Sequence, residues 1–271
     1  MNHIQSIKLY IPLIGIFCIL FLAFFANYLP HDPIEVDLTK KFLPPTMEHW
    51  LGTDHLGRDV LTRLIYGART SLFSVFIICV LIVFFSFIVG FIAGYKGGYY
   101  DAIFMRICDI FFAFPTFILA LFLIGILGVG LNNVIIAIVL THWAWYARIV
   151  RSLVLESRSH PFVLASIAMG SSEWQVIVRH ILPSVFSQMI ILVTLDIGHM
   201  LLHVSGLSFL GLGVTAPTPE WGVMINDAAP HIMEHYTLII YPGLAIFITV
   251  ALFNLLGEAL RDRLDPEYEV V

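Results

Sequence analysis

Six long apolar stretches constrain this 271-residue chain more than any other feature of its sequence. A membrane-spanning helix needs about 20 mainly apolar residues. The sequence provides such stretches near residues 9–29, 71–95, 107–129, 134–150, 185–211 and 236–256. Hydrophobic residues make up 59% of the chain and charged residues only 12%, unlike the balance of a soluble domain. The sequence therefore predicts an all-α integral membrane protein with about six transmembrane helices.

Charge and cysteine usage exclude several classes of function. The net charge of -5 is small and scattered, which argues against nucleic acid as a partner. Cys18, Cys79 and Cys108 lie in apolar stretches without Cys-x-x-Cys spacing, so we expect small buried hydrophobes rather than disulfides or a thiolate metal site. The first apolar stretch exceeds the apolar region of a signal peptide and lacks a following Ala-x-Ala site. We expect it to remain as a membrane anchor.

The distribution of lysine and arginine predicts the orientation of the chain. With the N-terminus inside, the inner segments carry Lys8, Lys96, Arg106, Arg148, Arg151, Arg158, Arg179, Arg261 and Arg263. The outer loop 214–235 carries neither residue type, while segment 30–70 mixes basic with acidic residues and therefore weighs little in this rule. Both termini and segment 159–183 are therefore predicted to be cytoplasmic.

Segment 159–183 is an amphipathic interruption between two apolar stretches. Ser159 and Pro161 favour a helix start, and Gly170 permits a turn that other residues resist. Ser172 and Gln175 have the spacing of a capping box, which predicts a second short helix running toward the Leu-Pro pair at the end of the segment. The spacing alone fits either a protruding element for a partner or an amphipathic element resting on lipid headgroups.

A family resemblance favours the first interpretation. The segment resembles the permease motif of bacterial ABC importers, at which such permeases dock on their ATPases, and the resemblance rests on Ala165, Ser166, Gly170, Leu182 and Pro183. Leu164 stands where the motif has glutamate and His180 where it has isoleucine, so an ion pair at the glutamate position is not carried over. The resemblance implies ATPase coupling through Phe162, Ala165, Ser166, Met169, Gly170, Leu182 and Pro183.

A second stretch, His-Trp-Leu-Gly-Thr-Asp-His-Leu-Gly-Arg-Asp at 49–59 and its continuation to residue 72, resembles the signature of the peptide and nickel branch of these permeases. Thr53 or Asp54 can cap a helix here. Asp54 with Arg58, and Asp59 with Arg63, have the spacing of helical acid-to-base pairs. We expect an amphipathic helix leading into the second span, either as a structural lid or in contact with substrate.

Three further stretches, 140–154, 194–228 and 260–266, resemble the nickel-importing members of this branch, so the likeness covers nearly the whole chain. The resemblance implies the type I ABC importer permease fold with a cytoplasmic coupling helix. It also implies a cargo of nickel or a related transition metal, carried free, as a chelate or as a metallophore complex. The alternative within the family is a di- or oligopeptide importer.

Polar residues in the fifth span bear on that choice. Asp196, His199 and His203 are spaced i, i+3 and i+7, so they share one helix face. An ionised carboxylate near the bilayer middle costs about 2.5–3.5 kcal/mol and should face a partner or a wet cavity. These residues either form an interhelical hydrogen-bond cluster, with His142, Trp143 or Trp145 as partners, or line a translocation path. The path hypothesis names Asp196, His199, His203 and His142, with no metal ligand assigned.

Two smaller patterns concern helix packing. Gly90, Gly94 and Gly98 repeat the spacing that lets membrane helices approach closely. Arg106 and Asp109 are expected to form an ion pair at the inner interface.

The sequence contains no Gly-x4-Gly-Lys-Ser/Thr phosphate loop and no metalloprotease or serine hydrolase motif. We therefore expect a transporter subunit that is not an enzyme and binds no cofactor itself, with ATP used by partner subunits. An intramembrane enzyme or an ion channel that uses the Asp196 and His199 face is the alternative from another class.

The resemblance completes the prediction. It implies an N-terminal anchor with an extracytoplasmic segment at 1–70, a permease core of five transmembrane helices at 71–265 and a short cytoplasmic tail at 266–271. The expected partners are a homologous second permease in a heterodimer, two ATP-binding subunits, an extracytoplasmic solute-binding protein and membrane lipid. The expected location is the inner or plasma membrane of a bacterium.

Overall fold

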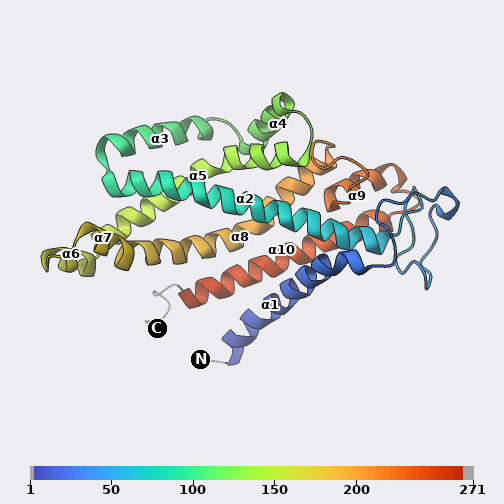
Figure 1. Ribbon diagram of the computed structural model, residues 1–271, viewed down its shortest axis with the longest axis horizontal. Coiled ribbons are helices and arrows are strands. Elements are labelled where there is room, and N and C mark those ends of the chain that lie inside the picture. Colours follow the sequence, from blue (N-terminus) through green and yellow to red (C-terminus); the bar gives the residue numbers. More distant parts are fainter. Residues whose placement is uncertain (1–2, 265–271) are drawn as a thin grey trace.

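The computed structural model describes residues 3–264, which are mostly helical (Figure 1). The α-helices are α1 (His3–Phe24), α2 (Val60–Lys96), α3 (Gly98–Phe112), α4 (Thr116–Leu127), α5 (Leu131–Ser159), α6 (Pro161–Ala168), α7 (Glu173–Val176), α8 (Leu182–Phe209), α9 (Trp221–Ala228) and α10 (Thr237–Leu264). Short 3-10 turns η1 (Phe25–Tyr28), η2 (Leu38–Lys40) and η4 (Ala229–His231) and the π-helical segment η3 (Ile177–Ile181) complete the described elements. Within residues 3–264 no sheet forms, which confirms the all-α prediction there; the predicted tail 266–271 lies outside the described residues.

Five described helical segments are long and apolar enough to cross a membrane. They are Lys8–Tyr28, Val60–Lys96, Leu131–Ser159, Glu173–Phe209 and Thr237–Leu264. A sixth crossing results only if α3 and α4 are taken together. The predicted number of about six spans is therefore confirmed, with one span of unusual form.

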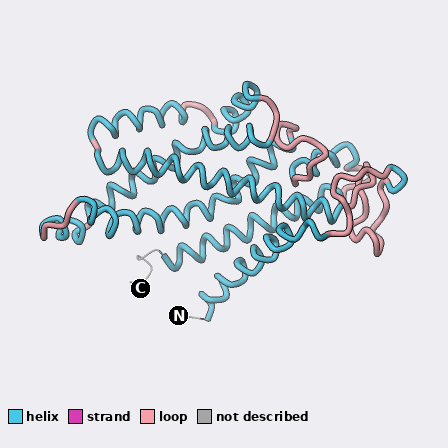
Figure 2. Tube along the Cα trace, viewed as in Figure 1, coloured by secondary structure: helices cyan, strands magenta, loops and turns pink. Residues whose placement is uncertain are grey.

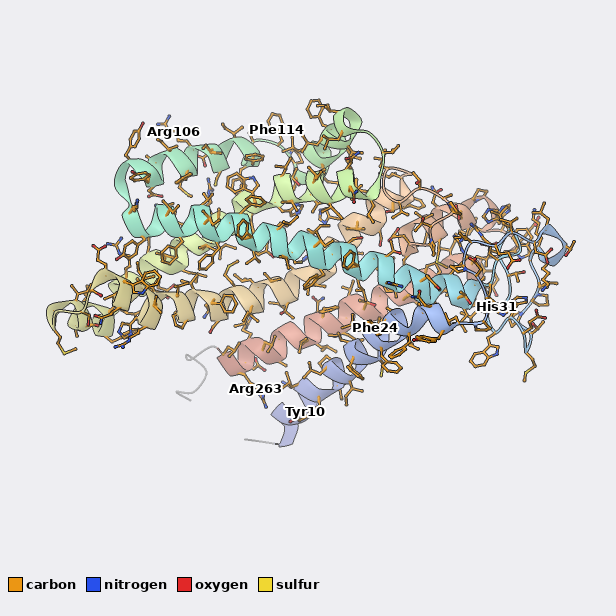
Figure 3. The ribbon with its side chains drawn as sticks, in the orientation of Figure 1. Tyr10, Phe24, His31, Arg106, Phe114 and Arg263 are labelled. Atoms are coloured by element: carbon orange, nitrogen blue, oxygen red, sulfur yellow. The ribbon has the colours of Figure 1, made fainter. Side chains whose placement is uncertain are left out.

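The predicted third span is broken rather than straight. Helices α3 and α4 meet at an angle of 85°, with Pro115 directly before α4. Proline lacks a backbone N–H and disfavours helical geometry in the residue before it, so one helix cannot continue through Phe114. Figure 3 marks Arg106 on α3 and Phe114 at the break, both on the outer side of the bundle. The predicted pair of Arg106 with Asp109 does not form, because Asp109 instead pairs with Arg148 of α5.

Helices α2 and α5 pack closely through two of the three predicted glycines. A Cβ at Gly90 would fall against the backbone oxygen of Ala147 and 2.7 Å from Cβ of Val150, and one at Gly94 would lie 2.8 Å from the backbone oxygen of Arg151. Gly98 has no such role: it has a φ of +54° at the turn between α2 and α3, with nothing within 4 Å of the Cβ position. The glycine spacing therefore correctly predicts the contact at two positions.

The two ends of the bundle differ in character. Loops gather at one end, where the extended segment 29–59 and the turns around α9 lie together (Figure 2). At the opposite end lie α6 and α7, and the start of α1 and the end of α10 also lie away from the loops (Figure 1). We call these the loop end and the hairpin end.

The cysteines are free, and two of them behave as predicted. Cys79 and Cys108 are buried, whereas Cys18 on α1 is exposed on the surface of this chain, contrary to the expectation that all three are buried. Helix α1 contacts the rest of the bundle along one side, mainly against α10 and α2, and its other side stays open.

Gly90→Ala tests the α2–α5 contact. The added methyl group meets a backbone oxygen that cannot rotate away, so we expect the free energy of unfolding to fall by about 1–3 kcal/mol. The control is Gly125→Ala in α4, where nothing lies within 4 Å of the Cβ position; it should be neutral or stabilise by up to about 1 kcal/mol. The measurement is thermal stability of the detergent-solubilised protein. Equal stability of the two variants would contradict the close packing.

Candidate functional site

The predicted polar residues of α8 gather with two residues of α5. Asp196 Oδ1 lies 3.1 Å from Nδ1 of His199, and Asp196 Oδ2 accepts a hydrogen bond of 2.6 Å from the hydroxyl of Tyr146. The ring of His142 meets that of His203 edge-on, with 4.9 Å between their centroids. We call these five residues the Asp196 cluster.

The three imidazoles of the Asp196 cluster have a common arrangement. Nδ1 of His203 lies 2.8 Å from the backbone oxygen of His199, and Nδ1 of His142 lies 3.1 Å from that of Ile138. Nδ1 of His199 faces the Asp196 carboxylate. Because these oxygens only accept hydrogen bonds, each Nδ1 carries the proton in the neutral ring and each Nε2 keeps its lone pair. The cluster therefore offers three imidazole nitrogens that can each accept a proton, but its side chains do not bring three ligand atoms together as a metal site would require.

The Asp196 cluster is open on one side of the chain. The His199 side chain is 72% exposed and that of Asp196 is 18% exposed. An aspartate–histidine pair at this depth is costly in contact with lipid tails. The arrangement therefore suits a water-filled cavity or an interface with another subunit.

Sequence reasoning found four members of the cluster and missed Tyr146. Tyr146 follows His142 by four residues, so the two share a face of α5 and the spacing could have identified it. The two proposed tryptophan partners do not bond to Asp196: Trp143 packs against Phe111, and Trp145 packs against Tyr146.

Segment 159–183, the coupling segment, forms a hairpin of helical turns. Helix α6 begins at Pro161 and ends before Gly170, which has a φ of +88°. The Ser172 side chain accepts from the Gln175 backbone while the Gln175 side chain accepts from Ser172, so the predicted capping box is present. A hydrogen bond of 2.9 Å from Ser166 to Ser171 closes the turn.

The second helix of the coupling segment does not end at Leu182 and Pro183, as the sequence had suggested. α7 continues through the π-helical segment η3 into α8, so Glu173–Phe209 is one helical rod. Pro183 closely follows the π-helical segment, whose changed hydrogen-bond register accommodates the missing N–H without a break in the rod. Leu182 and Pro183 therefore belong to the rod, away from the tip of the hairpin.

The tip of the coupling segment is apolar and exposed. Met169 is 81% exposed and Trp174 is 71% exposed, and Phe162, Leu164 and Ile167 are each more than half exposed. Ala165 also lies on the exposed surface, whereas Ser166 is buried under it. Sequence reasoning did not name Ile167 and Trp174 among the coupling residues. Their large apolar side chains on either side of the Gly170 turn could have identified them as part of the exposed tip.

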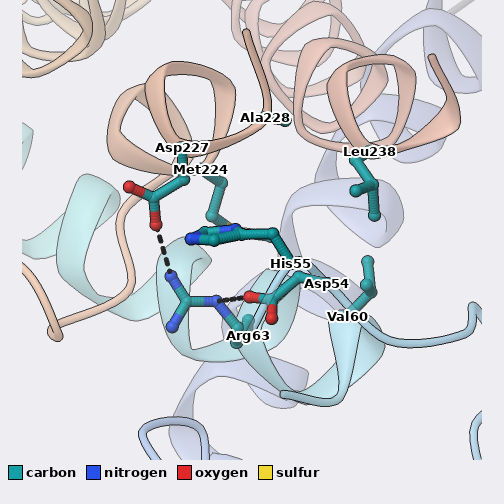
Figure 4. A pocket seen from close by; sticks show the side chains of 8 residues that line it. All are labelled: Asp54, His55, Val60, Arg63, Met224, Asp227, Ala228 and Leu238. Atoms are coloured by element: carbon teal, nitrogen blue, oxygen red, sulfur yellow. Dashed lines mark hydrogen bonds and ion pairs between the residues drawn. The ribbon is translucent and has the colours of Figure 1, made fainter. Parts of the chain in front are cut away.

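At the loop end, two buried arginines are held by two aspartates. Nε of Arg58 lies 2.7 Å from Asp54, and its guanidinium also lies 3.1 Å from Asp227 of α9. Arg63 of α2 lies 3.4 Å from the same two carboxylates (Figure 4). His55 lies beside this network and is partly buried, and its burial lowers the pKa of the imidazole.

This network corrects the predicted helix at 49–72. Asp54 and Arg58 do pair, but inside a loop, because Asp54 accepts from the backbone of Leu56 and Arg58 and Gly57 has a φ of +79°. Helix α2 starts only at Val60, with Asp59 as its N-cap. Asp59 pairs with His49 rather than with Arg63.

Glu220 is a further buried residue that sequence reasoning missed. It is fully buried and accepts hydrogen bonds from Ser71 of α2 at 2.8 Å and Ser205 of α8 at 3.1 Å. Its other oxygen accepts from the backbone of Val223 and so caps α9. One carboxylate thereby joins three helices at the loop end.

Comparison with known proteins gives consistent results. Residues 86–270 match the family described as binding-protein-dependent transport system inner membrane component. The nickel transport system permease protein NikC of Escherichia coli K12 is 54% identical over 239 residues, covering 88% of this chain and 86% of the relative. The metal-staphylopine import system permease protein CntC of Staphylococcus aureus NCTC 8325 is 42% identical, covering 87% and 82%. The dipeptide transport system permease protein DppC of Bacillus subtilis 168 is 40% identical, covering 93% and 81%.

The family match spans more than half of the chain, and these three relatives align with most of it. This chain belongs to the binding-protein-dependent inner membrane components, the permease subunits of ABC importers.

Proposed function

We propose that this chain is one of two homologous permease subunits of an ATP-driven bacterial importer for nickel or a related transition metal, carried as a chelate or metallophore complex. The observation that carries the proposal is the 54% identity to a nickel permease over 88% of the chain. Identity to a metal-staphylopine permease supports a chelated cargo. The imidazoles of the Asp196 cluster add chemistry that suits such a metal.

The orientation follows from charge and from the arrangement of the ends. The coupling segment, the start of α1 and the end of α10 all lie away from the loop end, as Figure 3 shows for Tyr10 and Arg263. Because basic residues favour the cytoplasmic side, we assign the hairpin end to the cytoplasm and the loop end to the extracytoplasmic side. An extracytoplasmic solute-binding protein would then meet segment 29–59 and α9.

The coupling segment supports docking on two partner ATPase subunits, which hydrolyse ATP. Its exposed apolar tip, with Met169 and Trp174 at its two sides, is the kind of surface that a partner groove buries. Closure of the ATPases would displace this tip as a rigid body. The displacement would pass along the rod Glu173–Phe209 to the Asp196 cluster within it.

The cargo is tested by uptake in a strain that lacks the endogenous importer. We expect radioactive nickel to accumulate only when this permease and its partner subunits are expressed together, and accumulation to change when small organic chelators are added. The control is a strain without the partner ATPases. A dipeptide importer, suggested by the 40% identity to DppC, would instead restore growth on dipeptides and leave nickel uptake at background.

Gly170→Val tests the coupling segment. A β-branched residue is strained by about 1–3 kcal/mol at the φ of +88°, although nothing lies within 4 Å of the Cβ position. We expect normal membrane abundance with reduced co-purification of the ATPases and reduced uptake. Gly170→Asn, which tolerates this conformation better, should restore much of both.

The matched control for strain alone is Gly211→Val. Gly211 has a φ of +77° and equally open surroundings, but it lies past the other end of α8. This variant should keep its ATPases. Normal co-purification together with normal uptake in Gly170→Val would remove the turn from the coupling mechanism.

Asp196→Asn and His199→Asn test the path. Asparagine at 199 can still donate from near the Nδ1 position to Asp196 but lacks Nε2, so the cluster persists while one candidate metal contact is lost. We expect uptake per folded transporter to fall in both variants. His235→Asn, at the loop end, is the control.

If the Asp196 cluster only ties helices together, a different pattern results. The two asparagine variants would then transport at the wild-type rate, and Asp196→Ala would lower protein abundance by leaving the Tyr146 hydroxyl without its partner. The measurement is metal uptake divided by the amount of folded protein.

A further inference from the structure

A second group of possible metal ligands lies at the loop end, apart from the Asp196 cluster. His31, His49 and Asp59 bring one ligand atom each within 4.8 Å of the others. The rings of His31 and His49 lie against each other, with 4.7 Å between their centroids. Figure 3 shows His31 among the loops of the loop end, away from Arg263.

His49 is held with one ring nitrogen satisfied and the other free. Its side chain is only 5% exposed, and Nδ1 lies 3.0 Å from Oδ1 of Asp59. The other Asp59 oxygen accepts from the backbone of Thr62 at the start of α2, so the carboxylate is fixed. Nδ1 therefore carries the proton and Nε2 keeps its lone pair, yet this buried Nε2 has no hydrogen-bond partner.

An unsatisfied buried nitrogen costs about 1–3 kcal/mol unless something binds it. A carboxylate on Nδ1 with a free Nε2 is the arrangement that orients histidine ligands in metal sites. Asp59 has both oxygens engaged, so it suits the role of a positioning residue rather than a ligand.

The Glu48 carboxylate and the neighbouring His31 ring are the groups that could complete a metal site around Nε2. Oε1 of Glu48 lies 3.8 Å from Nε2 of His49, too far for a hydrogen bond. Ligand atoms around a tetrahedral ion with bonds near 2.0 Å are roughly 3.3 Å apart, so a small movement would suffice. Nε2 of His31 lies 3.0 Å from the backbone oxygen of Glu48, which leaves its other ring nitrogen with a lone pair.

The ammonium group of Lys40 lies at the edge of the proposed ligand group and pairs with Glu48. Nζ of Lys40 is 3.2 Å from Oε1 of Glu48. Both side chains are substantially exposed, so Lys40 can move into solvent when a divalent ion takes its place.

We propose that His49 Nε2, the Glu48 carboxylate and the His31 ring bind one divalent late transition-metal ion, Ni²⁺ or Zn²⁺, at the extracytoplasmic face. Two imidazoles with one carboxylate favour these ions over Mg²⁺ or Ca²⁺. A bound ion would tie segment 29–49 to the start of α2. The site is independent of the cargo and of the Asp196 cluster.

The test measures metal bound to the purified importer complex in detergent. The background carries Asp196→Asn and His199→Asn, so the Asp196 cluster contributes less binding. After chelator treatment and its removal, NiCl₂ or ZnCl₂ is titrated, and bound metal per complex is counted by mass spectrometry. We expect one ion that depends on His49, and a melting temperature that rises with metal.

His49→Asn is the central variant, because it can still donate to Asp59 but lacks Nε2. It should lose this ion and the metal-dependent rise in melting temperature. Asp59→Asn should weaken binding by about 10–100-fold, as expected for a group that orients a ligand. His235→Asn, also at the loop end, should bind as the background does.

Lys40→Ala gives a result of opposite sign. Removing the competing ammonium group should strengthen metal binding, while a purely structural Lys40–Glu48 pair predicts no such gain. His31→Gln, which keeps a donor to the Glu48 backbone, provides a second loss variant if His49→Asn folds poorly. Equal binding in the background, His49→Asn and His31→Gln, or no binding in the background, would overturn the proposal.

Discussion

The ion pairs of two buried arginines with two aspartates are the constraint on which the architecture of the loop end depends. Arg58 and Arg63 are each 2% exposed, and burying a guanidinium costs several kcal/mol unless it is matched by a nearby opposite charge. The matching carboxylates come from Asp54 and from Asp227, which is 169 positions from Arg58. Segment 29–59 and α9 must therefore lie over the start of α2. The buried Glu220 then joins this layer to α2 and α8 through two serines.

The rod Glu173–Phe209 connects this layer with the opposite side of the membrane. Its 37 residues span about 55 Å. The rod begins at the coupling segment, carries Asp196 and His199 near its middle and reaches Ser205 beside Glu220. Because a packed helix resists bending, a displacement at one end is felt along its length. Beside the rod, α2 and α5 form a closely packed pair of helices through Gly90 and Gly94.

Local patterns in the sequence predicted those features that depend on neighbouring residues. Apolar stretches of sufficient length gave the spans, Gly170 gave the turn, and the Ser172–Gln175 spacing gave the capping box. Ion pairs between residues far apart in the sequence could not be predicted from such local patterns. The spacing of Asp59 and Arg63 suggested a helical ion pair, but His49 and Asp227 compete for these charges from elsewhere in the chain. No local pattern distinguishes the two outcomes.

The same distinction applies to the candidate site. The period of α8 placed Asp196, His199 and His203 on one face, which required no knowledge of the fold. That Tyr146 completes the cluster depends on how α5 crosses α8. The continuity of α7, η3 and α8 also escaped prediction, because a π-helical segment absorbs the change in register where the sequence suggested a break at Leu182 and Pro183.

The exposure of the Asp196 cluster finally bears on what surrounds this chain. His199 is 72% exposed next to a carboxylate within a membrane span, and an aspartate facing lipid at that depth would cost about 2.5–3.5 kcal/mol. The Tyr146 hydroxyl and His199 offset part of this cost, but they leave the outer side of the imidazole open. Water in a cavity or a neighbouring protein would satisfy that side, whereas lipid tails would not. The polar face of α8 therefore requires a surface other than lipid next to it, a requirement that the isolated chain does not meet.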